Sequence, residues 1–380
     1  MNQRRSAFIH SPELEAIPYP EDCPFTSSRA GMTRRTLESM GLLSSAGRSV
    51  VPAPPAGEQA LLRFHTPDYL RVLRDAQEGR LEPEGLHMGL GTPDCPVFRG
   101  MFDYAALACG ATLRGADLLL NGEADVAFNP SGGYHHAHAE RAAGFCYLND
   151  VVLGCFRMAD AGRRVMFVDV DAHHCDGVQA ACYGRSDIMT VSFHQSGLTL
   201  FPGTGFTRET GAAGAEGLSV NLPLPVGTYD SVYLRAFREL VPPLFEAFAP
   251  DVLVLELGMD GLAGDPLAGL RLTNNCHAAV VEALLGFNRP LLVTGGGGYH
   301  PENTARGWAL CWSLMCGAGG GEELGLGLGG VMLESSEWQG GLRDRQIFVD
   351  EPLRSSVEAE VLTGVSRVRE MVFPLHGLQP

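Results

Sequence analysis

The chain of 380 residues lacks the features that mark several protein classes. It contains no apolar run of about 18 residues, so no membrane-spanning helix is expected. Residues 1–24 carry charges and prolines but not the apolar stretch of a signal peptide. Ten cysteines are present, yet none forms a Cys-x-x-Cys pair and several lie in apolar runs, which disfavours a disulfide framework. We therefore expect a soluble cytoplasmic protein with reduced thiols.

Basic side chains are scarce as well, with 28 against 44 acidic ones and a formal net charge of −16. Nucleic acid is not expected as a partner, because its phosphates are held mainly by basic side chains, and neither is a membrane. An acidic surface suits cationic peptides or amines, although net charge speaks first to solubility. The hydrophobic fraction of 45% is enough for one large domain with a tail. Whether the chain forms a homo-oligomer stays open.

Short apolar runs alternate with longer helical stretches. The clearest strand candidates are residues 126–128, 165–170, 188–193, 252–257 and 291–293, and the helical candidates include 101–120, 229–248 and 351–371. Continuous apolar strands are expected where helices cover both faces of a parallel sheet. The pattern predicts an α/β fold with three layers, helix–sheet–helix, around a mostly parallel open sheet. Residues 317–330 are rich in glycine and predict a loop or linker.

Polar or glycine-rich residues follow each of the five strand candidates. These clusters begin at Ser131, Asp169, His194, Asp260 and Gly295. Ligands of open α/β sheets bind at the carboxyl ends of the strands. The five clusters are therefore expected to converge on one crevice.

The segment VDVDAHHCD at residues 168–176 is the most informative cluster. Strand alternation places Asp169, Asp171 and His173 on a common side if the extended chain continues. A carboxylate and an imidazole two positions apart can bind one metal ion, and catalytic zinc takes three protein ligands and keeps water at an open position. Asp260, at another strand end, is the best candidate for the third ligand. A lone Asp would be assigned to a helix cap, but burying several charges without a metal is costly.

Two further clusters suit acid–base chemistry and oxyanion binding. Gly132 and Gly133 permit an irregular turn that presents His135 and His136 together, and imidazoles titrate near neutral pH. Taken alone, a surface histidine run explains this segment equally well. The four glycines at 295–298 allow a close backbone approach, and no Lys-Ser/Thr follows them as a phosphate loop would need. Tyr299 comes directly after them and can donate its hydroxyl to a developing oxyanion.

The ordered set of motifs resembles the histone deacetylase superfamily, specifically its class I-like and bacterial acetoin-utilisation branch. The matching stretches are DCP at 94–96, FDYAA at 102–106, GGYHHA at 132–137, GFCYLND at 144–150, VDVDAHH at 168–174, FPGTG at 201–205, LAGD at 262–265 and GGGGY at 295–299. The resemblance extends over about residues 8–315 and implies an arginase-like α/β sandwich. It further implies a catalytic domain at 1–315 and a tail at 316–380 that packs on or extends that domain.

The resemblance implies hydrolysis of the acetyl amide of Nε-acetyl-lysine in proteins, with release of acetate. The implied ligands of one zinc ion per chain are Asp171, His173 and Asp260. The implied ligands of a nearby potassium ion are Asp169, Asp171, His173, Ser192 and Phe193.

The catalytic roles implied by the resemblance fall on two His–Asp pairs and one tyrosine. His135 would pair with Asp169 and His136 with Asp176, so that each carboxylate sets the tautomer of its imidazole. His136 would be the general base, His135 would assist electrostatically, and Tyr299 would donate to the oxyanion.

The resemblance also implies a narrow channel for the acyl-lysine. Its implied contacts are Asp94 at the rim, Gly144 along the channel, Phe145 and Phe201 as walls, Leu267, Tyr299, and Arg29 near an acetate exit. Acetylpolyamine deacetylases often carry an acidic residue seven positions after the last zinc ligand, where this chain has Leu267. This favours protein lysine over a polyamine as the substrate.

Some alternatives stay open and others fit less well. Deacylation of acetylpolyamines or of longer lysine acyl groups stays open. An arginase-like enzyme with two metal ions fits less well, because Cys175 and Leu262 stand where a second metal would need carboxylates. A non-catalytic acyl-lysine reader would be expected to have lost a ligand, a histidine or the tyrosine. Cys175 replaces a glycine that is usual in the family and would be strained at a positive φ; a buried inert thiol is favoured over a redox role.

Overall fold

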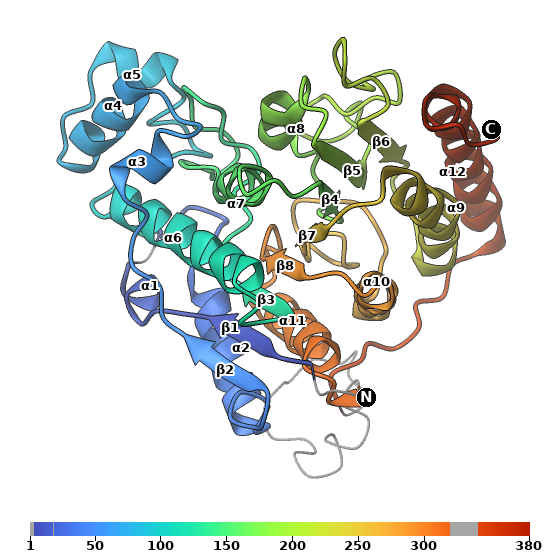
Figure 1. Cartoon of the computed structure of the whole chain (residues 1–380), viewed down its shortest axis with the longest axis horizontal. Helices are drawn as coiled ribbons and strands as arrows, with labels where there is room; N and C mark the ends of the chain where they lie inside the picture. Colours follow the sequence, from blue (N-terminus) through green and yellow to red (C-terminus); the bar gives the residue numbers. More distant parts are fainter. Residues whose placement is uncertain (1–3, 18, 320–340) are drawn as a thin grey trace.

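The computed structural model describes residues 4–17, 19–319 and 341–380. Its centre is one eight-stranded sheet in the order β2-β1-β3-β8-β7-β4-β5-β6, and every pair of neighbours is parallel. The strands are β1 Ser6–Ile9, β2 Arg48–Val51, β3 Val126–Asn129, β4 Val165–Asp169, β5 Ile188–Gln195, β6 Ser219–Leu224, β7 Val252–Glu256 and β8 Leu291–Thr294. The α/β prediction is confirmed, and the sheet is parallel throughout (Figure 1).

Helices cover both faces of this sheet. The helices are α1 Glu13–Ala16, α2 Ser28–Ser39, α3 Glu58–Leu61, α4 Pro67–Gln77, α5 Pro83–His87, α6 Met101–Leu120, α7 Asp150–Ala159, α8 Asp176–Cys182, α9 Asp230–Phe248, α10 Asn274–Gly286, α11 Pro301–Met315, α12 Glu351–Val372 and the 3-10 helix η2 Phe373–His376. Alternate strand residues point to opposite layers. Phe8 and Phe128 pack in one core with residues of α2 and α9–α12, whereas Ile9 and Ala127 pack in another with residues of α6–α8.

The predicted strands are buried on both sides. All five predicted strands and the helices α6, α9 and α12 are present, with ends that differ from the prediction by at most two residues. The short first strand β1 and the two edge strands, β2 and β6, were not predicted. β2 is half exposed and begins with Arg48, and β6 contains Pro223. Edge strands tolerate charged residues and proline, so they lack the continuous apolar pattern that marks a central strand.

The C-terminal helix belongs to the main core. α12 buries Val357, Val361, Val365, Val368 and Val372, a helical stripe, within the core that includes α9 and β6, and it lies beside α9 in Figure 1. From residue 320 on, the predicted glycine-rich segment at 317–330 lies outside the described residues.

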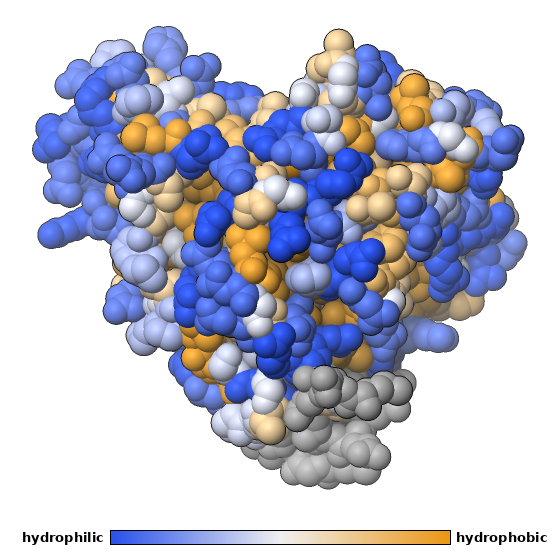
Figure 2. All heavy atoms as spheres, viewed as in Figure 1, coloured by the Kyte–Doolittle hydropathy of each residue, from blue (hydrophilic) through white to orange (hydrophobic). Residues whose placement is uncertain are grey.

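The face of the molecule in Figure 2 is mostly polar. Figure 2 shows hydrophilic residues over most of one face, with apolar residues in small separate patches between them. Within residues 4–17, 19–319 and 341–380, no helix is long and apolar enough to cross a membrane.

A buried histidine stabilises the start of α7 and makes the protein sensitive to acid. His65 is 2% exposed, and its Nε2 accepts a hydrogen bond from the backbone N–H of Asn149, the N-cap of α7, at 3.0 Å. Burial lowers the pKa of His65 to about 4. The unfolded chain therefore takes up a proton near pH 6.5 that the folded protein resists.

Acidification from pH 7 to pH 4 should consequently erode the stability that His65 provides. This contribution is complete above pH 6.5 and is lost as the pH falls towards 4, by about 3 kcal/mol in total. Urea unfolding of the parent and of His65→Gln at both pH values measures it. The parent should be the more stable at pH 7, and the difference in unfolding free energy should shrink by about that amount at pH 4. A difference that does not change with pH would contradict this account.

Candidate metal centre and catalytic site

The predicted polar clusters lie at one edge of the sheet. They begin at or after the carboxyl ends of β3, β8, β7, β4 and β5, which are neighbours in that order. The last residues of four of these strands, Asn129, Thr294, Glu256 and Asp169, are paired side by side across the sheet. Parallel strands end on the same side, so side chains that are distant in sequence meet here.

Asp171, His173 and Asp260 form a buried group that could hold a metal ion. One ligand atom from each lies within 4.8 Å of the others. His173 Nδ1 is 3.2 Å from Asp171 Oδ1 and 2.8 Å from Asp260 Oδ2. One imidazole nitrogen and two carboxylate oxygens are atoms that bind zinc, and three is the number of protein ligands that a catalytic zinc site takes.

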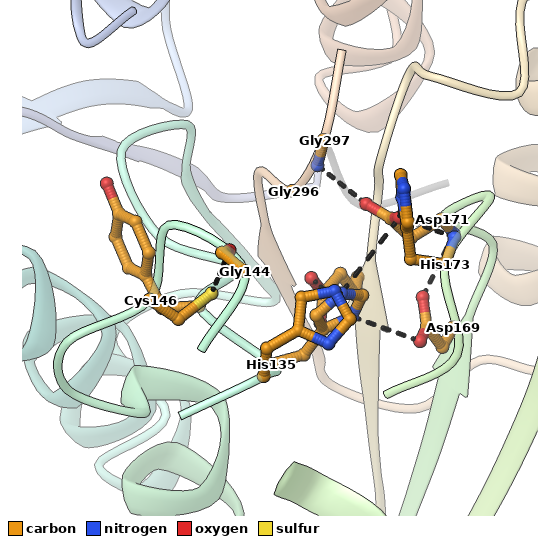
Figure 3. A network of polar contacts seen from close by, with 12 residues as sticks. His135, Gly144, Cys146, Asp169, Asp171, His173, Gly296 and Gly297 are labelled. Carbon is orange, nitrogen blue, oxygen red and sulfur yellow. Dashed lines mark hydrogen bonds and ion pairs between the residues drawn. The ribbon is translucent and has the colours of Figure 1, made fainter. Parts of the chain in front are cut away.

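Backbone amides hold both carboxylates in place. Gly297 donates its N–H to Asp171 Oδ2 at 2.6 Å (Figure 3), and Ala172 donates to Asp260 Oδ1 at 2.8 Å. A Cβ atom at Gly297 would overlap Asp260. The glycine run is therefore needed here for close approach of the backbone to the acidic group.

The charges of this group are not balanced by the protein alone. Burial and the neighbouring Asp171 raise the pKa of Asp260 to about 7. Burial by itself lowers the pKa of His173, but its hydrogen bonds to the two carboxylates outweigh this and raise it to about 10. Two buried carboxylates thus share one imidazole. A divalent cation would supply the missing positive charge, so these residues fit a zinc ion.

Two histidines lie next to this group, each with a carboxylate behind it. His135 Nε2 and His136 Nε2 are 3.0 Å apart. His135 Nδ1 lies 3.3 Å from Asp169 Oδ2, and His136 Nδ1 lies 2.7 Å from Asp176 Oδ1. In both imidazoles the Nδ1 atom therefore faces a carboxylate, and the Nε2 atom faces the other imidazole.

The surroundings shift the pKa values of the two histidines in opposite directions. Burial, reinforced by His135, lowers the pKa of His136 to about 3, so His136 is unprotonated at neutral pH. Burial also lowers the pKa of His135, but the carboxylates of Glu256, Asp171 and Asp169 outweigh it and raise the pKa well above its ordinary value. One imidazole can accept a proton, and the other carries positive charge.

Glu256 is a member of this site that the sequence analysis missed. Its Oε1 lies 3.0 Å from His135 Nδ1, closer than Asp169, and its side chain is fully buried. Burial raises the pKa of Glu256 well above its ordinary value. The available signal was an acidic residue at the end of the apolar strand VLVLE, since such a residue is costly to bury without a partner.

Asp169, Asp171 and His173 were expected on a common side if the extended chain continued, and this condition is not met. β4 ends at Asp169, and Asp171 donates its backbone N–H to Asp169 Oδ1 at 2.9 Å in the turn that follows. Asp169 groups with His135 and Glu256, whereas Asp171 groups with His173. Strand alternation does not apply beyond the end of a strand.

Cys175 has φ −76° and no backbone strain, and burial raises the pKa of its thiol, as expected for an inert cysteine.

A narrow cavity lies beside the possible metal ligands and the two histidines. It has a volume of about 20 Å³, and its lining includes His136, Phe145, Asp171 and Tyr299. This is room for about one water molecule. Burial raises the pKa of Tyr299 well above its ordinary value, so its hydroxyl keeps the proton that it can donate.

The residues expected to form the substrate channel lie around this cavity. A Cβ atom at Gly144 would come within 2.5 Å of His136 Cδ2 and 3.0 Å of Phe201 Cε1, so the backbone of Gly144 packs against both rings. The N–H of Gly144 donates to Asp94 Oδ2 at 3.0 Å. Phe201 is 46% exposed, and its ring centroid is 4.9 Å from that of His136.

Two further residues fasten the loop of Tyr299. Asp265 accepts the N–H of Leu267 at 2.9 Å and that of Tyr299 at 2.8 Å, which joins the loop of Leu267 to Tyr299. The buried Arg29 donates to the carbonyls of Gly298 at 2.7 Å and of Gly296 at 3.0 Å. No role for Asp265 was predicted from the sequence.

Two of the residues expected to bind a potassium ion, Ser192 and Phe193, lie on β5, the strand next to β4. Ser192 pairs with Asp169 across β4 and β5, and its Oγ is 2.8 Å from His194 Nδ1. Phe193 is fully buried in the main core.

Known proteins resemble this chain over most of its length. The family model for the histone deacetylase domain matches residues 23–315. Histone deacetylase 8 of Xenopus tropicalis is 39% identical over 316 residues, which are 82% of this chain and 84% of that protein. Histone deacetylase 3 of Oryza sativa subsp. japonica is 38% identical over 327 residues, 85% of this chain and 62% of that protein. The chain thus spans less than two thirds of the rice relative.

A solved structure agrees with these relatives. The crystal structure of an HDAC homolog from Aquifex aeolicus has a TM-score of 0.81 to this chain at 31% identity, and the match covers 94% of this chain and 100% of the other. Sequence and fold therefore point the same way, and the chain belongs to the histone deacetylase family.

Proposed function

We propose that this protein is a zinc-dependent protein lysine deacetylase, which hydrolyses the acetyl amide of Nε-acetyl-lysine and releases acetate. The observation that carries the proposal is the cavity between one buried three-ligand group, an unprotonated histidine and a tyrosine hydroxyl. This arrangement suits hydrolysis of an unactivated amide, which needs a polarised carbonyl, a base for water and a donor for the oxyanion.

Zinc bound by Asp171, His173 and Asp260 would polarise the acetyl carbonyl and acidify the attacking water. His136 then takes the proton of the water at Nε2 and later gives it to the departing lysine amine. Asp176 accepts the Nδ1–H of His136, so the lone pair with which this ring acts as the base lies at Nε2. The positive charge of His135 and the hydroxyl of Tyr299 stabilise the negative charge of the tetrahedral oxyanion.

The substrate enters between aromatic walls in this proposal. Phe145 and Phe201 flank the lysine stem, Gly144 lies along it, and Asp94 at the rim accepts hydrogen bonds from the backbone of the substrate. Leu267 favours a protein lysine because it offers no carboxylate to a second amine. A potassium ion at Asp169, Asp171, His173, Ser192 and Phe193 would further balance the buried acids.

Metal analysis and an acyl panel test the proposal together. We expect one zinc per chain, loss of activity with a chelator, and faster hydrolysis of acetyl-lysine peptides than of acetylpolyamines or of longer acyl-lysines. The chain contains no lysine, so any acetyl-lysine signal in the reaction belongs to the substrate. His136→Ala should lower kcat by about 10²–10⁴-fold.

Other outcomes of the same panel would identify a different function. Two metal ions per chain would indicate a dinuclear ureohydrolase-like site. Preference for an acetylpolyamine would replace the substrate class. Binding of acetyl-lysine peptide without turnover in the zinc-loaded protein would indicate a reader.

A further inference from the structure

A third histidine contacts the carboxylate behind the catalytic base. Asp176 Oδ1 lies 2.7 Å from His136 Nδ1, and Asp176 Oδ2 lies 3.0 Å from His138 Nε2. The His136 side chain is 6% exposed, whereas that of His138 is 20% exposed. One carboxylate therefore joins a buried imidazole to one that reaches towards solvent. The proposed mechanism assigns no task to His138.

We propose that His138 is a positioning residue for the general base, acting through Asp176. The inference rests on the proposed function, in which His136 moves the proton. A carboxylate held at one oxygen turns easily about its terminal torsion, whereas a second hydrogen bond at the other oxygen stops that rotation. Asp176 is then fixed in the plane that His136 needs, and Nε2 of His136 keeps its direction towards the cavity.

Arg141 competes for the same nitrogen of His138. Arg141 Nη2 lies 2.9 Å from His138 Nε2, so this atom lies near both a donor and an acceptor and can serve only one. Burial raises the pKa of Asp176, but the hydrogen bonds from His136 and His138 outweigh it and lower the pKa, which keeps Asp176 an ionised acceptor.

The side chain of Arg141 is exposed and can turn to water, whereas the Asp176 side chain is only 12% exposed. A bond to a charged, largely buried acceptor outweighs one to an exposed donor. The Nε2–H tautomer of His138 that donates to Asp176 is therefore the one expected.

Three variants of the full-length, zinc-loaded protein test the role. His138→Ala should lower kcat by about tenfold and leave KM within about twofold, because His138 supports the base but does not line the cavity. His138→Gln keeps an amide donor at similar reach and should recover most of kcat. His376→Ala removes a histidine whose Nε2 bonds the carbonyl of Gly217 instead, and should match the parent.

Proton NMR supplies a readout that does not depend on turnover. The Nδ1–H proton of His136, hydrogen-bonded to Asp176, should give a downfield signal in the parent and in His138→Gln. The signal should broaden or vanish in His138→Ala, because Asp176 then rotates away and the Nδ1–H proton exchanges with water. If the parent hydrolyses no acyl-lysine, the proposed function fails, while this signal still tests the positioning role.

Several results would overturn the inference. They are an unchanged kcat and His136 signal in His138→Ala, a change in KM alone, or a His138→Gln variant as impaired as His138→Ala. Arg141→Ala should keep the kcat of the parent. A tenfold loss in Arg141→Ala would show that the contact with Arg141, and not that with Asp176, is the one that matters.

Discussion

Replacing Tyr299 with phenylalanine should leave the zinc content unchanged and lower kcat for an acetyl-lysine peptide by about 10²–10³-fold. The substitution removes one hydroxyl from the lining of the cavity and keeps the ring that packs 5.5 Å from Phe145, measured between centroids. The hydroxyl is needed most when the carbonyl oxygen becomes an oxyanion, so the loss falls on kcat more than on KM. Steady-state kinetics and elemental analysis of the variant measure both effects.

A second tyrosine serves as the matched control. Tyr183 lies at the end of α8 and is not part of the cavity lining, so Tyr183→Phe should keep the kinetics of the parent. Parent-like turnover in Tyr299→Phe would remove Tyr299 from the mechanism. A rise in KM at constant kcat would instead give its hydroxyl a role in substrate binding.

Asp260→Asn should have opposite effects on stability with and without metal. With zinc present the variant should bind far less metal, melt at a lower temperature than the parent and lose at least about 10²-fold in kcat, because several kcal/mol of transition-state stabilisation come from such an ion. With a chelator present the variant should be more stable than the parent by up to about 4 kcal/mol, the free energy that corresponds to a pKa raised by about three units. Thermal unfolding at pH 8 in both conditions measures the reversal.

The reversal follows from the raised pKa of Asp260. This pKa is about 7 in the folded, metal-free protein and near 4 in an unfolded chain. The folded state binds the proton more tightly than the unfolded state, so metal-free stability falls as the pH rises through about 7. Asparagine cannot ionise and avoids this cost. The exposed Asp68 on α4 offers a control, since Asp68→Asn should change neither melting temperature.

A variant that is destabilised equally in both conditions would contradict the metal assignment. Such a result would mean that Asp260 serves mainly to accept the N–H of Ala172. Normal zinc content in the variant would have the same meaning.

The central strands, three of the helices and many residues of the candidate site could be predicted from the sequence. Strands covered on both faces are apolar throughout, and this local pattern survives without knowledge of the fold. Asp171 and His173 lie two residues apart, so their common site is a local property of the chain. Asp260 was assigned from its place after another strand, which relies on the general rule that parallel strands end at the same edge.

The tertiary structure alone decided the partners within the site. Glu256 looks like the end of an apolar strand, and its role depends on β7 lying beside β4, so that it pairs with Asp169 and reaches His135. His138 looks like one more residue of a histidine run, and its role depends on α8 bringing Asp176 against it.

Sequence periodicity thus determined which five strands are apolar throughout and where each of these five ends. The order of strands in the sheet determined which of those ends meet. That order depends on long-range packing, and no local pattern carries it.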